Sequence, residues 1–275
     1  MRLGTALVDG RAVPVLQRRG ALLPLAGGSL LELIAAGAVP EVAPDAEPLV
    51  GGRLAAPLRP PKIVAIGLNY LDHVRESGMD AAPERPLVFT KFPTSVIGDG
   101  DRIEFDPALT ERVDWEVELA VVVGRRMRNV ATEDALAHVF GYTVANDVSA
   151  RDLQFGDGQW VRGKSLDTFC PLGPVIVTAD EVPDPQALGL RTRVNGETVQ
   201  DSNTTEMVFG VAELLAFCSR SFTLEPGDVI LTGTPWGCGE FMDPPRSLRN
   251  GDVVEVEVDG IGVLRNEVVE RSLLP

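Results

Sequence analysis

The chain has 275 residues, 44% of them hydrophobic, and its 40 acidic and 25 basic side chains give a net charge of −15. This acidic excess argues against nucleic acid or an anionic membrane surface as the main partner. No run of 18 apolar residues and no signal-peptide core is evident, so we expect a soluble cytoplasmic protein. Its three widely spaced cysteines suit a reducing compartment, and its two histidines exclude a histidine-rich metal site.

The first 58 residues are expected to form a small N-terminal unit, followed by a larger domain over residues 59–275. Asp9-Gly10 predicts a hairpin turn, and Ser29 with Glu32 forms a capping box in front of a short helix. Residues 39–61 contain six prolines and few large apolar side chains. That composition is typical of an extended connector with little packing of its own.

From residue 62 onward, short apolar segments alternate with turns. The pattern predicts strands at 63–66, 87–89, 115–123, 142–148, 173–177, 254–258 and 261–269. It also predicts helices at 133–140, ended by Gly141, and at 206–220. Because strands outnumber helices, we expect a β-rich α+β domain and not a doubly wound sheet.

Carboxylates alternate at the start of the most strongly predicted strand. Asp114, Glu116 and Glu118 would share one face, with the last two about 7 Å apart. Carboxylates that point the same way repel unless a cation lies between them, and Mg²⁺, Mn²⁺ and Ca²⁺ prefer such oxygen ligands. A half-buried strand with a solvated acidic face explains the same alternation, and it is the commoner case for this motif alone.

A third carboxylate, Asp147, interrupts the apolar run at 142–148. Burying an Asp is costly unless it is paired or coordinated. The alternative is a turn residue at the strand end, beside Asn146. Taken together, the three carboxylates favour a metal site more than either motif does alone.

Three further segments carry groups suited to catalysis or substrate binding. His73 and Glu76 are spaced i, i+3, so on one helical turn Glu76 would orient His73 as a general base; an exposed His with an incidental acidic neighbour is the alternative. Lys164 lies in a polar segment before an apolar strand, where it would stabilise an enolate or simply be solvated. Thr234 follows the apolar run 229–231, in a loop that either binds a substrate carboxylate or is an ordinary turn.

These segments occur in the order found in one family: the chain resembles the fumarylacetoacetate hydrolase family over residues 61–269. The matching motifs are residues 67–70 with His73 and Glu76, then 89–91, 114–122, 141–152, 164–168, 226–230 and 232–235. Seven motifs in the same order argue strongly against coincidence. The resemblance therefore outweighs the alternatives given for each motif alone.

The resemblance implies a mixed β-sandwich roll that binds a divalent metal, usually Mg²⁺ or Mn²⁺ and sometimes Ca²⁺, in a homodimer. By motif position, the metal ligands would be Glu116, Glu118 and Asp147. The acid–base pair would be His73 and Glu76, with Lys164 as the third catalytic residue. The expected substrate contacts are Tyr70, Lys91, Gln154 and Thr234.

For activity, the resemblance implies a metal-dependent hydrolase that cleaves a C–C bond in a 2,4-dioxo acid, such as an acylpyruvate or fumarylpyruvate. The products would arise through a metal-stabilised enolate. An oxaloacetate-type decarboxylase or a 2-hydroxydienoate isomerase would use the same enolate, and a non-catalytic ligand-binding relative is a further alternative. Cys238 departs from the family pattern, which usually has a small aliphatic residue at that position.

Overall fold

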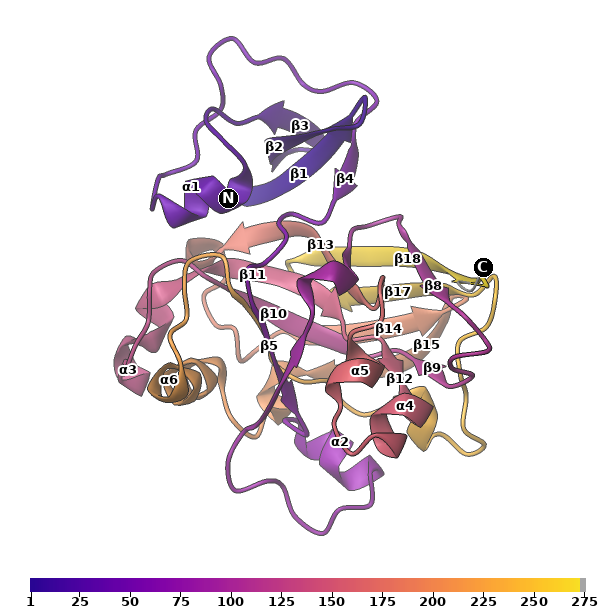
Figure 1. Cartoon of the computed structure of the whole chain (residues 1–275). Coiled ribbons are helices and arrows are strands. Elements are labelled where there is room, and N and C mark those ends of the chain that lie inside the picture. Colours follow the sequence, from indigo (N-terminus) through magenta and orange to yellow (C-terminus); the bar gives the residue numbers. More distant parts are fainter. Residues whose placement is uncertain (273–275) are drawn as a thin grey trace.

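Two β-sheets facing each other form the body of the protein, which we describe over residues 1–272 of a computed structural model (Figure 1). In order, the large sheet contains β3 (Ala21–Pro24), β2 (Arg11–Arg18), β1 (Arg2–Val8), β13 (Cys170–Thr178), β11 (Val139–Asn146), β10 (Val117–Val123), β16 (Val229–Leu231), β5 (Ile63–Gly67) and β6 (Leu87–Lys91). Two short strands, β4 (Arg53–Ala55) and β7 (Val96–Ile97), pair with β1 and β13.

The second sheet has the order β15 (Glu197–Asn203), β14 (Gly189–Val194), β17 (Val253–Val258), β18 (Gly262–Glu270) and β8 (Arg102–Phe105). A separate two-stranded ribbon joins β9 (Val113–Asp114) to β12 (Ser149–Ala150). Most strand pairs are antiparallel, whereas β5 with β16, β7 with β13 and β8 with β18 are parallel. The predicted β-rich α+β sandwich is confirmed.

Helices are short and lie at the ends and edges of the sheets (Figure 1). The α-helices are α1 (Leu30–Ala35), α2 (Leu71–Glu76), α3 (Thr132–Ala135), α4 (Arg151–Gly156), α5 (Val161–Lys164) and α6 (Val211–Ser221). The 3₁₀ turns are η1 (Pro93–Ser95), η2 (Leu136–His138), η3 (Ala179–Glu181), η4 (Thr204–Glu206) and η5 (Gly239–Phe241). Within residues 1–272, none of the helices is long and apolar enough to cross a membrane.

The main apolar core lies between the two sheets. Alternation along β17 points Val254, Val256 and Val258 into this core, where they join Val117 and Val144 of the large sheet. Glu255 and Glu257 are half-buried on the other face of β17. The expected polar-out alternation of this strand is therefore confirmed.

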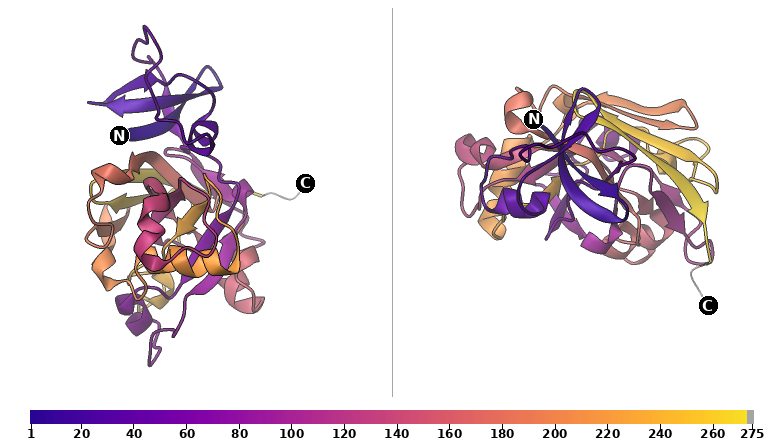
Figure 2. Two further views of the ribbon diagram at one scale, coloured as in Figure 1. Left: turned by 90° about the vertical axis from the view of Figure 1, so that its left-hand side faces the viewer. Right: turned by 90° about the horizontal axis from the view of Figure 1, so that it is seen from above.

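The N-terminal elements β1 to β4 and α1 form a small cap above the remaining strands of the large sheet (Figures 1 and 2). Asp9-Gly10 makes the turn between β1 and β2, and the Ser29–Glu32 capping box begins α1, as predicted. β1 extends the large sheet by pairing with β13, through Arg2 opposite Val177 and Leu3 opposite Ile176. The boundary near residue 58 stays a prediction. The connector is more ordered than expected, because β4 within it pairs with β1.

Several predicted elements have different bounds. The strand expected at 142–148 is β11, which ends at Asn146 and leaves Asp147 outside it, and the strand expected at 173–177 is the longer β13. The helix expected at 133–140 ends at Ala135 and is followed by the 3₁₀ turn η2. The backbone N–H groups of Gly124 and Arg125 bond to the carbonyl oxygen of His138, and β11 begins at the next residue, so the helix cannot extend further. Gly141 lies inside β11 and does not end the helix. The helix expected at 206–220 begins only at Val211. The strand expected at 115–123 begins at Val117 and leaves Glu116 outside it.

Candidate active site

Strand pairing brings the three predicted metal ligands together. β10 and β11 are antiparallel, and Val117 opposite Asn146 is the final pair of their ladder. Glu116 therefore precedes β10 at the point where Asp147 follows β11, and the Asp147 N–H donates to the Glu116 carbonyl oxygen at 2.9 Å. One carboxylate oxygen from each of Glu116, Glu118 and Asp147 lies within 4.8 Å of the others.

Burial and charge act differently on the two glutamates of this triad. Burial by itself would raise the pKa of Glu116, but the Lys164 ammonium and the Arg151 guanidinium outweigh it and lower that pKa to about 2. Burial raises the pKa of Glu118 well above its ordinary value, and the negative charges of Asp147 and Glu116 raise it further. Glu118 is thus the carboxylate whose charge is least compensated.

Cations surround the other two carboxylates of the triad. Lys164 Nζ lies 2.6 Å from Glu116 and 2.9 Å from Asp147. Lys91 Nζ donates to Asp147 at 2.5 Å, and Arg151 contacts Glu116 at 2.7 Å. Because charges this deeply buried need partners, the ion pairs explain how the triad is tolerated in the core.

The donor set fits a hard divalent cation. It consists of carboxylate oxygens, which Mg²⁺, Mn²⁺ and Ca²⁺ prefer, and burial together with the charges of Asp147 and Glu116 raises the pKa of Glu118. The Tyr70 side chain is also fully buried near Glu118. Burial, followed by the charges of Glu118 and Asp72, raises the pKa of Tyr70. Glu116, Glu118 and Asp147 are therefore the residues that would hold a metal ion.

His73 and Glu76 meet on α2 as their spacing predicts. His73 Nδ1 lies 2.7 Å from Glu76 Oε1, and the Gly237 N–H donates to Glu76 Oε2 at 2.7 Å. The His73 ring also packs edge-on against Phe241, with the ring centroids 5.5 Å apart. Glu76 and Phe241 thus hold the imidazole in one orientation, which a general acid or base requires.

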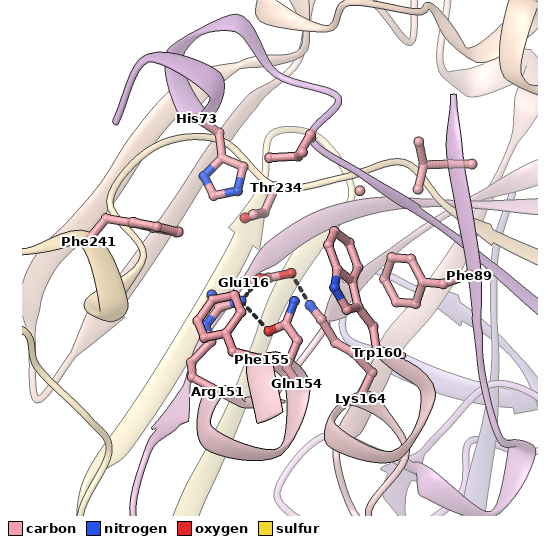
Figure 3. Close-up of a pocket in the computed structure, with 13 residues that line it drawn as sticks. His73, Phe89, Glu116, Arg151, Gln154, Phe155, Trp160, Lys164, Thr234 and Phe241 are labelled. Atoms are coloured by element: carbon pink, nitrogen blue, oxygen red, sulfur yellow. Dashed lines mark hydrogen bonds and ion pairs between the residues drawn. The ribbon is translucent and has the colours of Figure 1, made fainter. Parts of the chain in front are cut away.

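A cavity of about 60 Å³ separates this pair from the carboxylates. Figure 3 shows His73 and Thr234 on one side, with Glu116, Gln154 and Lys164 on the other. Aromatic side chains make up much of the remaining wall: Phe89, Phe155, Trp160 and Phe241. A mainly apolar enclosure with a few convergent polar groups is typical of a small-molecule site.

The four expected substrate contacts divide into two pairs. Gln154 and Thr234 line the cavity. Lys91 and Tyr70 do not line it, and both are fully buried. Lys91 points from the end of β6 toward the back of the triad, where it contacts Asp147 and the carbonyl oxygens of Val148 and Lys164. These contacts place Lys91 beside Asp147, one of the expected metal ligands, and not on the wall of the cavity.

Arg151 is a site residue for which the sequence suggested no role. It begins α4, lines the cavity, pairs with Asp114 at 2.7 Å and donates to Gln154 at 3.0 Å. Asp114 in turn accepts hydrogen bonds from the N–H groups of Gly239 and Glu240. A buried Asp needs a cationic partner. Asp114 was therefore the residue in the sequence that could have pointed to a partner such as Arg151.

Comparison with known proteins identifies the family. A sequence model of the family described as "Fumarylacetoacetate (FAA) hydrolase C-terminal" matches residues 62–269. Among curated proteins, the chain is 51% identical to "Oxaloacetate tautomerase fahd2, mitochondrial" from Xenopus laevis, over 78% of this chain and 68% of that protein. It is 50% identical to "Oxaloacetate tautomerase FAHD2A, mitochondrial" from Homo sapiens, over 78% of this chain and 69% of that protein.

Solved structures agree with this assignment. A fumarylacetoacetate hydrolase from Exiguobacterium antarcticum superposes with a TM-score of 0.91 at 44% identity, covering 98% of this chain and all of that one. A 2-hydroxyhepta-2,4-diene-1,7-dioate isomerase from Mycobacterium marinum superposes with a TM-score of 0.80 at 36% identity, covering 99% of each chain. The family match over most of the chain, together with these similarities, shows that this protein belongs to the fumarylacetoacetate hydrolase family.

Proposed function

We propose that this protein interconverts the keto and enol forms of a small 2-oxo dicarboxylic acid of the oxaloacetate type, with a divalent cation in the carboxylate triad. The observation that carries the proposal is the position of the His73–Glu76 pair across a cavity of about 60 Å³ from Lys164 and Glu116. The cavity is enclosed and a few polar groups converge on it, which suits a small acid. The names of the curated relatives, which are oxaloacetate tautomerases, support the same reaction.

The reaction moves one proton from carbon to oxygen and needs no other reactant. A cation held by Glu116, Glu118 and Asp147 would polarise the 2-oxo group of the substrate. His73, oriented by Glu76, takes the proton from the carbon beside that group and then releases it to solvent, while the enolate oxygen takes up a proton from solvent to give the enol. The reverse direction runs the same steps backwards, with His73 returning a proton to the carbon. The Lys164 ammonium stabilises the negative charge of the enolate, while Gln154 and Thr234 supply polar contacts for the carboxylates.

Hydrolysis of a C–C bond is the second candidate. The 2.7 Å contact between His73 Nδ1 and Glu76 also suits removal of a proton from water, which that reaction requires. Decarboxylation of oxaloacetate would proceed through the same enolate. The names of the curated relatives favour tautomerisation over cleavage of a dioxo acid.

The test is turnover of oxaloacetate, acetylpyruvate and fumarylpyruvate with Mg²⁺, with Mn²⁺ and without metal. We expect metal-dependent relaxation of the oxaloacetate enol absorbance, without CO₂ release and without loss of the dioxo acids. Two acid or ketone fragments from a dioxo acid would replace the proposal with hydrolysis, and CO₂ from oxaloacetate would replace it with decarboxylation. No turnover of any substrate would contradict all three reactions.

His73→Asn should lower kcat for the interconversion by about 10²- to 10⁴-fold, because the variant removes the acid–base group. His138→Asn is the matched control, since His138 is the other histidine of the chain and lies on η2, away from the cavity. Activity in His73→Asn equal to that of His138→Asn would contradict the proposed role of the imidazole.

We also propose a homodimer, for which the test is sedimentation; a species of monomer mass would contradict it. A cytoplasmic location remains a prediction for this chain, whereas the vertebrate relatives are named as mitochondrial.

A further inference from the structure

The acid–base pair and Cys238, which lies beside it, form a second cluster of metal-binding groups. Cys238 is fully buried, and its Sγ lies 3.9 Å from His73 Nδ1. Donor atoms of His73, Glu76 and Cys238 all lie within 4.8 Å of one another. In residues 1–272, this cluster and the carboxylate triad are the two groups of at least three such side chains whose donor atoms lie this close together.

The two clusters differ in chemistry. The triad offers oxygen only, which suits hard cations, whereas an imidazole, a carboxylate and a thiol together suit Zn²⁺. Bonds to zinc of about 2.0 to 2.3 Å place the ligand atoms of a tetrahedral site about 3.3 to 3.6 Å apart. From the observed 3.9 Å and 2.7 Å separations, Cys238 would approach slightly and Glu76 would withdraw slightly. Three protein ligands plus a water molecule complete such a site.

The surroundings of Cys238 favour a cation. Burial raises the pKa of the Cys238 thiol well above its ordinary value, and three nearby carboxylates, those of Glu116, Asp114 and Glu76, raise it further. Arg151 is the opposing positive charge among these neighbours. A metal ion would supply the charge that this thiol needs to ionise.

The backbone also holds these ligands in place. The Gly237 N–H bonds to Glu76 at 2.7 Å, so the residue next to Cys238 is fastened to α2. His73 lines the substrate cavity, which gives an ion a route to the cluster.

We propose that Zn²⁺ binds to His73 Nδ1, the Glu76 carboxylate and the Cys238 thiolate, and thereby blocks the acid–base pair. Binding displaces the proton shared by His73 and Glu76 and the proton of the Cys238 thiol; both are released to solvent, with no change of oxidation state. Zinc on Nδ1 removes Glu76 as the partner that orients the imidazole. The inhibition rests on the proposed function, whereas the binding does not.

The binding test uses Co²⁺ as a spectroscopic probe and Zn²⁺ for stoichiometry. We expect a thiolate-to-cobalt charge-transfer band in the wild type, its loss in Cys238→Ser, and its retention in Cys218→Ser, a matched variant of a buried cysteine that belongs to neither cluster. Equilibrium dialysis should give two Zn²⁺ per wild-type chain, one of them in the triad, and one per Cys238→Ser chain. An unchanged band or stoichiometry in Cys238→Ser overturns the proposal.

Two further measurements distinguish a variant that does not fold from a proposal that is wrong. Thermal unfolding checks that Cys238→Ser is folded; if it is not, Cys238→Ala takes its place in the same assays. With Mg²⁺ saturating, the Zn²⁺ concentration for half-inhibition should rise at least about 10-fold in the folded Cys238 variant. Equal half-inhibition concentrations in the wild type and the Cys238 variant would overturn the proposed inhibition by Zn²⁺ at this cluster. A protein that binds Co²⁺ through the thiolate but turns over no substrate would contradict the proposed function while leaving the metal site intact.

Discussion

Glu118 differs from the other two carboxylates of the triad in its partners. Glu116 and Asp147 each form ion pairs with Lys164, whereas the hydrogen bond found for Glu118 comes from the Gly233 N–H at 2.7 Å. Burial and the two neighbouring carboxylates therefore raise the pKa of Glu118 well above its ordinary value. The metal-free site retains a proton on this residue at pH values where an exposed carboxyl is ionised.

This difference predicts a proton-linked metal affinity. A metal ion binds the ionised carboxylate, so it must displace the proton, and affinity should fall as the pH is lowered below the raised pKa of Glu118. Calorimetric titration with Mn²⁺ in buffers of different ionisation enthalpy should show that protons are released as the ion binds. Glu118→Gln should bind more weakly and release less. Binding of the same strength across this pH range, with no proton released, would contradict the account.

Among the structural elements, the loop that follows β16 connects the two halves of the site. Its Gly233 N–H bonds to Glu118, and its Gly237 N–H bonds to Glu76 at 2.7 Å. Gly237 has φ +96°, and a Cβ there would lie 2.1 Å from the carbonyl oxygen of Val199. Glycine is therefore required at this position, both for the backbone conformation and for the close approach to β15.

Gly237→Ala should displace the loop and misplace Glu76, lowering kcat/KM by about 10- to 100-fold. Gly251→Ala is the matched control, because Gly251 also has a positive φ of +85° but has open space where a Cβ would lie. The control should lose some stability and keep its activity. Equal kcat/KM values for the two variants, measured with saturating Mn²⁺, would show that the loop does not orient the pair.

At the scale of the whole molecule, the N-terminal cap covers the outer face of the central strands of the large sheet, among them β5 and β16. Leu3, Leu30 and Ile34 are buried in one apolar cluster with Ile63 and Val229 of that sheet. The cap lies on the opposite side of the molecule from α2, α4 and α5 (Figures 1 and 2). Its contribution is therefore expected to be to stability and not to the chemistry of the site.

Ile34→Ala should lower the free energy of unfolding by about 2 to 5 kcal/mol, because it leaves a cavity in this cluster. Val39→Ala serves as the control, since Val39 is 74% exposed and its truncation should change stability by no more than about 0.5 kcal/mol. Urea unfolding measures both values. Mn²⁺ affinity should be unchanged in both variants, and a loss of affinity in Ile34→Ala would show that the cap also supports the triad.

Local features were predictable because they depend on neighbours in the chain. The Ser29–Glu32 capping box and the His73–Glu76 contact both join residues three positions apart. The apolar alternation of β17 likewise needs only the two-residue period of a strand. The order of the motifs identified the family, which the match over residues 62–269 confirmed.

Where the bounds of an element were predicted wrongly, long-range hydrogen bonds determine the observed bounds. Val208 and Phe209 have helical periodicity with α6, but their N–H groups bond to the backbone and side-chain oxygens of Asn69, which holds them outside the helix. The Glu116 N–H donates to the Asn146 side chain, so Glu116 is not part of the ladder between β10 and β11, and β10 begins after it. The periodicity of apolar residues along the sequence does not reveal hydrogen-bond partners that are distant in the chain.

The sequence by itself determined the family, the sandwich fold and the types of side chain available for chemistry. Only the tertiary structure decided which charges meet: Lys91, Lys164 and Arg151 come from distant segments to the triad, and Cys238 comes to lie beside His73. The reason is physical, because a buried carboxylate or thiol takes its charge state from neighbours within a few ångströms, and strand pairing and loop packing supply those neighbours.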